Sequence, residues 1–364
     1  MIKVAPDRLS PAPSEWRTIH TPGFEVSWAG YCPLNSGFCF GSDDGRILTS
    51  DTEGTDQHAA KDALAPSREA INGFAFSGDS IAASTRSEIV IVSGAGDGRT
   101  GSRLVIPRGA HGIISMSSGL WVAPLGRGGL LTISPEGRSR EPATIHTVGG
   151  LPTNFYETVR VPVAGRDIVA CAARLGGVIG IELSTPSHVR PVFSLSRQGL
   201  DVVDVSALGG GSRAVAAVGR DGTIVLSRNV LSDASPVTVK LPFIQGIAYR
   251  LLHTHGDLIL LTSKALYALP GLAARFLAGE DVEHRMTAGK CWPMEAVDAN
   301  LAGNRWLLIV LVDGVVRIDL DQWLPSGATH ADLGDPLQAP SPSEAAWETS
   351  ESYSEETETS FAFA

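Results

Sequence analysis

The chain has 364 residues, of which 43% are hydrophobic, and it contains 40 Gly and 22 Pro. This composition indicates a β-rich globular protein with many tight turns, because Gly supplies positive φ and Pro interrupts strands. The net charge of −10 and the pI near 5.4 argue against a nucleic-acid-binding protein. The longest apolar run, residues 306–312, is too short to span a bilayer, and residues 1–8 lack an apolar signal segment. We therefore expect a cytoplasmic protein without a membrane partner.

The first strand-like segment, residues 15–20, stands apart from a series of repeats that begins after it. Each repeat opens on a strand pattern, and we expect these opening strands at residues 24–29, 71–76, 112–117, 156–161, 202–207, 246–251 and 295–301. The second repeat is the clearest, with further strands expected at 80–85, 88–92 and 103–107. Every repeat is thus expected to contribute several short antiparallel strands.

One aliphatic residue marks the same point of each repeat, and the markers recur 42 to 50 residues apart. The markers are Ile47, Ile89, Leu131, Ile179, Ile224, Leu266 and Val316. A period near 45 residues with strand patterns is typical of a β-propeller, in which each repeat forms one four-stranded blade. The sequence therefore predicts an all-β, seven-bladed propeller of four-stranded antiparallel blades.

The last repeat lacks a fourth strand, because the chain becomes Pro-rich and acidic after residue 324. We expect residues 15–20 to supply the missing strand, which would close the ring and remove exposed sheet edges. The predicted organisation is a propeller over residues 1–324 and a disordered acidic tail rich in Pro, Ser, Thr and Glu over residues 325–364.

Three stretches resemble the WD-repeat family of propellers. Residues 74–84 (Phe-Ala-Phe-Ser-Gly-Asp-Ser-Ile-Ala-Ala-Ser) match a strand, a turn and a second strand that ends in Ala-Ser, and residues 44–48 and 221–225 match the entry into the third strand. No blade ends in Trp-Asp, and the Gly-His pair of that family never occurs. The resemblance implies a degenerate WD-repeat-like propeller.

The tail carries most of the net charge. The tail holds no Lys or Arg, and the rest of the chain has a net charge of only −2. The acids of the tail are Asp332, Asp335, Glu344, Glu348, Glu351, Glu355, Glu356 and Glu358. Phe361 and Phe363 beside this acidic stretch suggest a docking motif, and a purely solubilising tail is the alternative. Because Ser and Thr crowd residues 349–360, control by cleavage or modification of the tail is a further alternative.

The expected turns between second and third strands carry a cation in repeats two to six: Arg86, Arg127, Arg174, Arg220 and Lys264. Repeats one and seven place Asp43, Asp44 and Asp313 there instead. Equivalent turns of a propeller emerge on one face, so these cations are expected to form an arc that attracts an acidic protein partner or the chain's own tail. Ordinary solvated turns are the alternative explanation.

Acidic residues near the inner strands offer a different function. Glu25, Glu157, Asp204, Glu295 and Asp298 could converge in the central channel, and a metal-dependent hydrolase would work there through Glu157, Asp204 and Asp298.

His253 and His255, with Asp257 nearby, have the alternate spacing that lets two imidazoles of a strand meet one zinc ion, although a polar turn explains them too.

Cys32, Cys39, Cys171 and Cys291 have no CxxC spacing and are expected to be buried thiols in a reducing cytoplasm. The sequence also lacks GxSxG, Walker, GxGxxG-helix and HExxH motifs. We therefore predict a non-catalytic protein-interaction scaffold with no cofactor, metal or small-molecule substrate, whose contact surface is the face of the second-to-third-strand turns.

Overall fold

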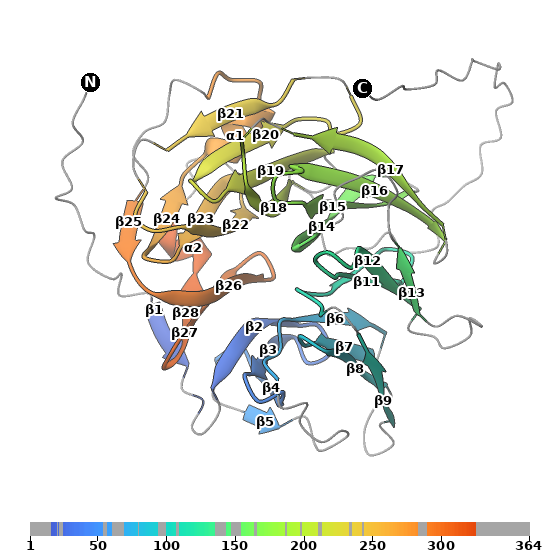
Figure 1. The fold of residues 1–364 in the computed structure, drawn as a ribbon. Helices are drawn as coiled ribbons and strands as arrows, with labels where there is room; N and C mark the ends of the chain where they lie inside the picture. The colour runs from blue at the N-terminus through green and yellow to red at the C-terminus, as the bar shows by residue number, and fades with distance from the viewer. Residues whose placement is uncertain are drawn as a thin grey trace, which may run out of the picture.

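The computed structural model describes residues 16–324 except 20, 22–24, 54–56, 60–68, 79, 94–99, 107–108, 135–142, 147–153, 164–165, 186–187, 197–198, 210–212, 233–234, 242–243 and 283–289. The described residues form seven four-stranded antiparallel sheets, arranged as blades around a common centre (Figure 1). This confirms the predicted seven-bladed β-propeller. The predicted tail, with Phe361 and Phe363, lies outside the described residues.

Blades 1 to 3 follow one another along the chain, each running from an inner to an outer strand. Blade 1 is β2 (Val26–Cys32), β3 (Gly37–Ser42), β4 (Ile47–Ser50) and β5 (Gln57–Ala59). Blade 2 is β6 (Gly73–Ser77), β7 (Ser80–Ser84), β8 (Glu88–Ser93) and β9 (Thr100–Val105). Blade 3 is β10 (Ile114–Ser115), β11 (Trp121–Pro124), β12 (Leu130–Ile133) and β13 (Ala143–His146).

Blades 4 to 6 repeat this order, and a short helix is inserted in blade 6 between its third and fourth strands. Blade 4 is β14 (Glu157–Val163), β15 (Arg166–Ala172), β16 (Val178–Thr185) and β17 (His188–Leu195). Blade 5 is β18 (Val202–Leu208), β19 (Ala214–Gly219), β20 (Thr223–Ser227) and β21 (Val237–Lys240). Blade 6 is β22 (Ala248–Thr254), β23 (Asp257–Thr262), β24 (Ala265–Leu269), α1 (Leu272–Leu277) and β25 (Lys290–Pro293).

Blade 7 joins the two ends of the described chain. It consists of β26 (Ala296–Ala302), β27 (Trp306–Leu311), β28 (Gly314–Asp319) and the N-terminal strand β1 (Trp16–Ile19), followed by α2 (Leu320–Trp323). β1 pairs antiparallel with β28, with Trp16 opposite Ile318 and Ile19 opposite Val315 (Figure 1). This confirms the predicted closure of the ring by residues 15–20.

The core lies between neighbouring blades rather than in one central mass. Buried aliphatic side chains of blades 5 and 6 form one cluster, and β1, blade 1 and blade 7 share another that contains Ile19, Phe38, Phe40 and Leu308. Both faces of a blade are covered in this way, so the second and third strands are almost continuously apolar. All seven marker residues of the repeat lie in the third strand of their blade.

The structure corrects several expected strand boundaries. In blade 3 only Ile114–Ser115 pair as inner strand, whereas residues 112–117 were expected, because the Met116 N–H turns back to the Leu120 carbonyl. In blade 2 the outer strand is Thr100–Val105 rather than 103–107.

No helix of the described residues is long and apolar enough to cross a membrane.

Candidate functional site

The turns between second and third strands lie at the end of each blade where the inner strand begins. In blade 4, for example, Glu157 at the start of β14 is opposite Ala172 at the end of β15. We call this side of the propeller the turn face. The five predicted partner-binding residues, Arg86, Arg127, Arg174, Arg220 and Lys264, all belong to these turns and therefore share the turn face.

The turns of blades 3 and 4 have the same hydrogen-bond pattern, which corrects one predicted equivalence. Leu125 N–H donates to the Gly129 carbonyl in blade 3, as Ala173 N–H donates to the Gly177 carbonyl in blade 4. Arg174 therefore corresponds to Gly126, and Arg127 corresponds to Leu175. Arg174 and Gly126 both have positive φ, of 56° and 54°. The cations thus point from different places of their turns and do not form an even arc.

Three of the five cations are paired with acids that precede an inner strand. Asp201 Oδ1 lies 3.0 Å from Arg174 Nε, and Asp201 Oδ2 lies 3.3 Å from Arg220 Nε. Lys264 pairs with Glu295. Each acid stands one residue before its inner strand and links neighbouring blades. Sequence analysis missed this pairing, although an acid immediately before β18 and β26 was a visible signal.

A cavity of about 490 Å³ opens at the centre of the turn face. Every blade contributes to its lining a residue at or just before the start of its inner strand: Ser27, Asn72, His111, Tyr156, Val203, Tyr249 and Val297. In blades 1, 5, 6 and 7 this residue is the extra one of a β-bulge, a register irregularity that redirects a side chain. The repeat therefore builds a ring of side chains that differ in chemistry from blade to blade.

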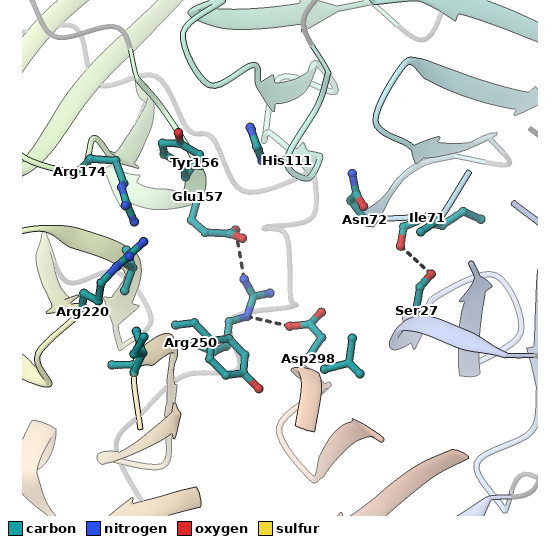
Figure 2. A pocket seen from close by; sticks show the side chains of 16 residues that line it. Ser27, Ile71, Asn72, His111, Tyr156, Glu157, Arg174, Arg220, Arg250 and Asp298 are labelled. Carbon is teal, nitrogen blue, oxygen red and sulfur yellow. Dashed lines mark hydrogen bonds and ion pairs between the residues drawn. The ribbon is translucent and has the colours of Figure 1, made fainter. Parts of the chain in front are cut away.

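Arg250 also lines the cavity and pairs with acids of two other blades (Figure 2). Its Nη1 is 3.1 Å from Glu157 Oε2, and its Nε is 3.6 Å from Asp298 Oδ1. The Arg250 Nε–H also donates to the Ala299 carbonyl at 3.1 Å, and Nη2 donates to Asn300 Oδ1. Arg250 thus occupies the position in which the hydrolase hypothesis requires a metal ion.

Asp204 completes the charged cluster from below. Its two carboxylate oxygens accept backbone N–H groups, from Val205 at 2.7 Å and from Leu251 at 2.6 Å. Asp204 is buried, and these bonds fix it as part of the junction between blades 5 and 6. The structure therefore brings Glu157, Asp204 and Asp298 together as predicted, but around a guanidinium that sequence analysis did not single out.

Burial and mutual repulsion alter the ionisation of these groups. Burial raises the pKa of Glu157 to about 8, and the negative charges of Asp204 and Asp298 add to the effect while Arg250 opposes it. Burial likewise raises the pKa of Asp204 to about 6, against the attraction of Arg250 and two backbone N–H groups. Burial alone would lower the pKa of Arg250, but the surrounding carboxylates raise it above its usual value. Glu157 therefore keeps its proton to a higher pH than an exposed glutamate does, beside a charged Arg250.

The other two predicted channel acids lie elsewhere. Glu25 and Glu295 each stand one residue before their inner strands and are on the turn face, not in the channel. A hydrogen bond with Asp43, and the charge of that group, raise the pKa of Glu25, whereas the hydrogen bond from Lys264 lowers the pKa of Glu295. Convergence was wrong for this pair because each acid stands two residues before the side chain of its strand that lines the cavity, Ser27 or Val297.

The two histidines of blade 6 do not share the extended geometry that the zinc hypothesis requires. His253 lies in β22, and its Nδ1 accepts the Gly209 N–H at 3.3 Å. His255 has a positive φ of 49° in the turn before β23, and Asp257 accepts the Gly271 N–H. No metal-ligand cluster of His, Cys, Asp or Glu occurs among the described residues. Of the four thiols, Cys32, Cys39 and Cys171 are buried as expected, and Cys291 is half-buried.

Comparison with known proteins gives a likeness in structure only. The sequence matches no family model and no curated protein. The structure of U3-55K matches with 12% identity and a TM-score of 0.62, over 85% of this chain and 100% of that chain. The RRP9 WD40 repeats match with 12% identity and a TM-score of 0.62, over 85% and 98%. The β-propeller domain of Cps50 (Swd1) from Myceliophteria thermophila matches with 13% identity and a TM-score of 0.60, over 83% and 97%.

The fold is that of a WD-repeat-like propeller. At these identities the likeness concerns the fold alone, so function has to be argued from the surface and the cavity of this chain.

Proposed function

We propose that this propeller is a non-catalytic scaffold or adaptor that binds another protein through its turn face. The main support is the distribution of exposed aliphatic side chains. Seven large hydrophobic residues are exposed among the described residues, and five of them lie on the turn face: Val105, Leu175, Ile247, Val297 and Val312. Exposed apolar groups gathered on one side of a protein are typical of an interaction surface.

The cavity strengthens this proposal, because Ile247 and Val297 form part of its lining. A partner that covers the turn face could bury apolar side chains at the rim and insert one side chain into the cavity, the usual arrangement of a binding hot spot. The rigid closed ring would present this surface with little loss of conformational entropy. The paired state of Arg174, Arg220 and Lys264 reduces their expected attraction for an acidic partner, since their charges are already compensated.

The test is an affinity purification from the native host with the full-length chain and with a turn-face variant. The variant carries Leu175→Ser, Ile247→Ser and Val297→Ser, which change side chains that are at least half exposed and should leave the melting temperature within about 2 °C. A partner that is recovered stoichiometrically with the wild type and lost with the variant supports the proposal. A matched variant with Leu34→Ser, in the turn between β2 and β3 at the opposite end of blade 1, should retain that partner.

A partner retained by the turn-face variant and lost by the matched variant would contradict the choice of face. Turnover of a substrate by the purified chain would contradict the non-catalytic assignment. The same purification with residues 325–364 removed separates the roles proposed for the tail, since a docking or regulatory tail changes recovery of the partner and a solubilising tail does not.

A further inference from the structure

The cavity holds more acids than cations at its floor. Glu157, Asp204 and Asp298 surround the single guanidinium of Arg250, so the formal charge of this group is −2 when all three carboxyls are ionised. Asp204 is fully hydrogen-bonded to backbone and serves as a fixed charge, whereas Glu157 and Asp298 line the cavity itself (Figure 2). The rim cations Arg174 and Arg220 share one acid, Asp201, so together they carry one uncompensated positive charge. Arg220 is half exposed, so solvent screens this positive charge more strongly than it screens the negative charge of the floor.

The walls above this floor suit an aliphatic stem. Val203, Tyr249, Val297 and Ile247 line one side of the cavity, and the Tyr249 hydroxyl is already bonded to the Ala296 carbonyl at 2.6 Å, which leaves its ring as a largely apolar wall. A Lys or Arg side chain combines a long apolar stem with a charged end, and it is buried favourably where apolar walls lead to an acidic floor.

We propose that the cavity binds a Lys or Arg side chain of a partner protein, presented by a segment whose neighbouring residues are aliphatic. The aliphatic neighbours would contact the exposed Leu175, Ile247 and Val297 around the opening. This inference rests on the proposed function and names the chemistry of its partner. Residues 325–364 contain no Lys or Arg, so the tail is not the occupant.

The state of Glu157 agrees with this assignment. Burial and the neighbouring Asp204 and Asp298 raise its pKa, so near neutral pH the site holds a proton in place of a missing positive charge. An incoming ammonium or guanidinium group supplies that charge and allows Glu157 to ionise, which strengthens the contact. An incoming carboxylate would meet Asp298 at the floor, and the arginines of the lining are already paired, Arg250 with Glu157 and Asp298 and the rim cations Arg174 and Arg220 with Asp201.

The test measures binding of the full-length chain to four pools of immobilised seven-residue peptides. The flanking positions are mixtures of Ala, Leu, Val and Ser, and the central residue is Arg, Lys, Gln or Glu. The Arg and Lys pools should bind about tenfold more tightly than the Gln pool, the effect of one charge-assisted hydrogen bond. Equal binding of all pools, a preference for Glu, or no binding to any pool overturns the assignment.

Variants locate the preference within the cavity. Glu157→Gln combined with Asp298→Asn should abolish the preference for Arg and Lys. Glu280→Gln combined with Asp313→Asn removes two exposed acids outside the cavity and should leave the preference unchanged. If the melting curve shows that the double variant does not fold, Glu157→Gln alone replaces it, because the glutamine amide oxygen can still accept a hydrogen bond from Arg250. This single variant should reduce the preference for Arg and Lys about threefold.

Two outcomes separate this inference from the proposed function. If peptides show no charge preference but the turn-face variant still loses its partner, the face is correct and the cation assignment is wrong. The chain's own first residues include Lys3 between Ile2 and Val4. Tighter peptide binding after Lys3→Gln would assign the cavity to that segment and overturn the partner assignment.

Discussion

Arg250 is the residue on which the centre of the molecule depends. It is enclosed by carboxyl groups from blades 4, 5 and 7, and its guanidinium also bonds to the backbone of β26 through the Ala299 carbonyl. Buried charges are costly unless they are paired, so the cation and the acids stabilise the fold only together. This pairing joins the inner strands of the four consecutive blades 4 to 7 at the centre of the ring.

Arg250→Gln should therefore destabilise the protein strongly. The change leaves Asp204, Asp298 and Glu157 without their cation, and loss of one member of a buried ion pair typically costs about 3–5 kcal/mol. Urea denaturation followed by circular dichroism measures the effect. Arg220→Gln is the control, since its pair with Asp201 is half exposed and is worth at most about 1 kcal/mol. Equal losses in the two variants would show that the Arg250 cluster contributes nothing special.

Glu157 makes the stability depend on pH. Its pKa is near 8 in the folded protein and about 4.5 in the unfolded chain, so the folded state binds an extra proton between these values. The free energy of unfolding should fall as pH rises from about 5 to 8, by up to about 1.4 kcal/mol per pH unit from this group. Glu157→Gln should flatten that decline, and urea midpoints at pH 5.5 and 8.5 measure it. An unchanged slope in the variant would contradict the raised pKa.

At the scale of the element, hydroxyl groups hold the turns in place of the Gly-His and Trp-Asp residues that this chain lacks. Thr85 Oγ1 accepts the Glu88 N–H at 3.1 Å, and Thr262 Oγ1 accepts the Ala265 N–H at 3.0 Å. Thr262 also donates to the Gln245 carbonyl at 2.6 Å and so ties its turn to the chain entering blade 6. A local side-chain bond can replace a longer network because the turn needs only its own polar groups satisfied.

Thr262→Val should cost about 1–3 kcal/mol, because a side chain of nearly equal volume replaces a buried hydroxyl that bonds to the Gln245 carbonyl and to the N–H groups of Lys264 and Ala265. Differential scanning calorimetry measures the shift in melting temperature. Ser232→Ala, in an exposed turn where the hydroxyl accompanies a backbone bond, is the control and should change stability by less than about 0.5 kcal/mol. A neutral Thr262→Val would show that the turn does not need the hydroxyl.

At the scale of the whole molecule, the ring is fastened where blade 7 meets blade 1. β1 supplies the outer strand of blade 7, and Ile19 is buried with Phe38 and Phe40 of blade 1. Arg317 of β28 reaches the Thr52 carbonyl and lies 3.1 Å from Glu53 beside blade 1. Trp292 packs against both Trp16 and Trp323 in tilted arrangements, with ring centroids 6.0 and 4.9 Å apart.

Deleting residues 1–21 should lower the melting temperature and promote association, because β28 becomes an unpaired edge strand. Light scattering coupled to gel filtration measures the association, and tryptophan fluorescence reports the loss of Trp16 from its contact with Trp292. Arg17→Ala in the full-length chain is the control, since its ion pair with Glu53 is exposed. A deleted protein that stays monomeric with an unchanged melting temperature would mean that β1 contributes little to closure.

The repeat period, the number of blades and the closing strand followed from the sequence alone, because each rests on local patterns that recur at a nearly constant spacing. The marker residues Ile47 to Val316 all lie in third strands, and the segment before the first repeat proved to be β1. The five turn cations were likewise placed on one face, since that placement depends only on the order of strands within a blade.

The partners of those residues were decided by the tertiary structure. Asp201 and Glu295 compensate turn cations, and Glu157 and Asp298 meet Arg250 across the centre. Glu25 lies outside the channel, one residue before its inner strand. Sequence shows which residues lie in equivalent turns, but β-bulges and the closure of the ring determine which side chains face one another. Charge compensation depends on distances of a few ångströms between distant segments, and only the closed ring sets those distances.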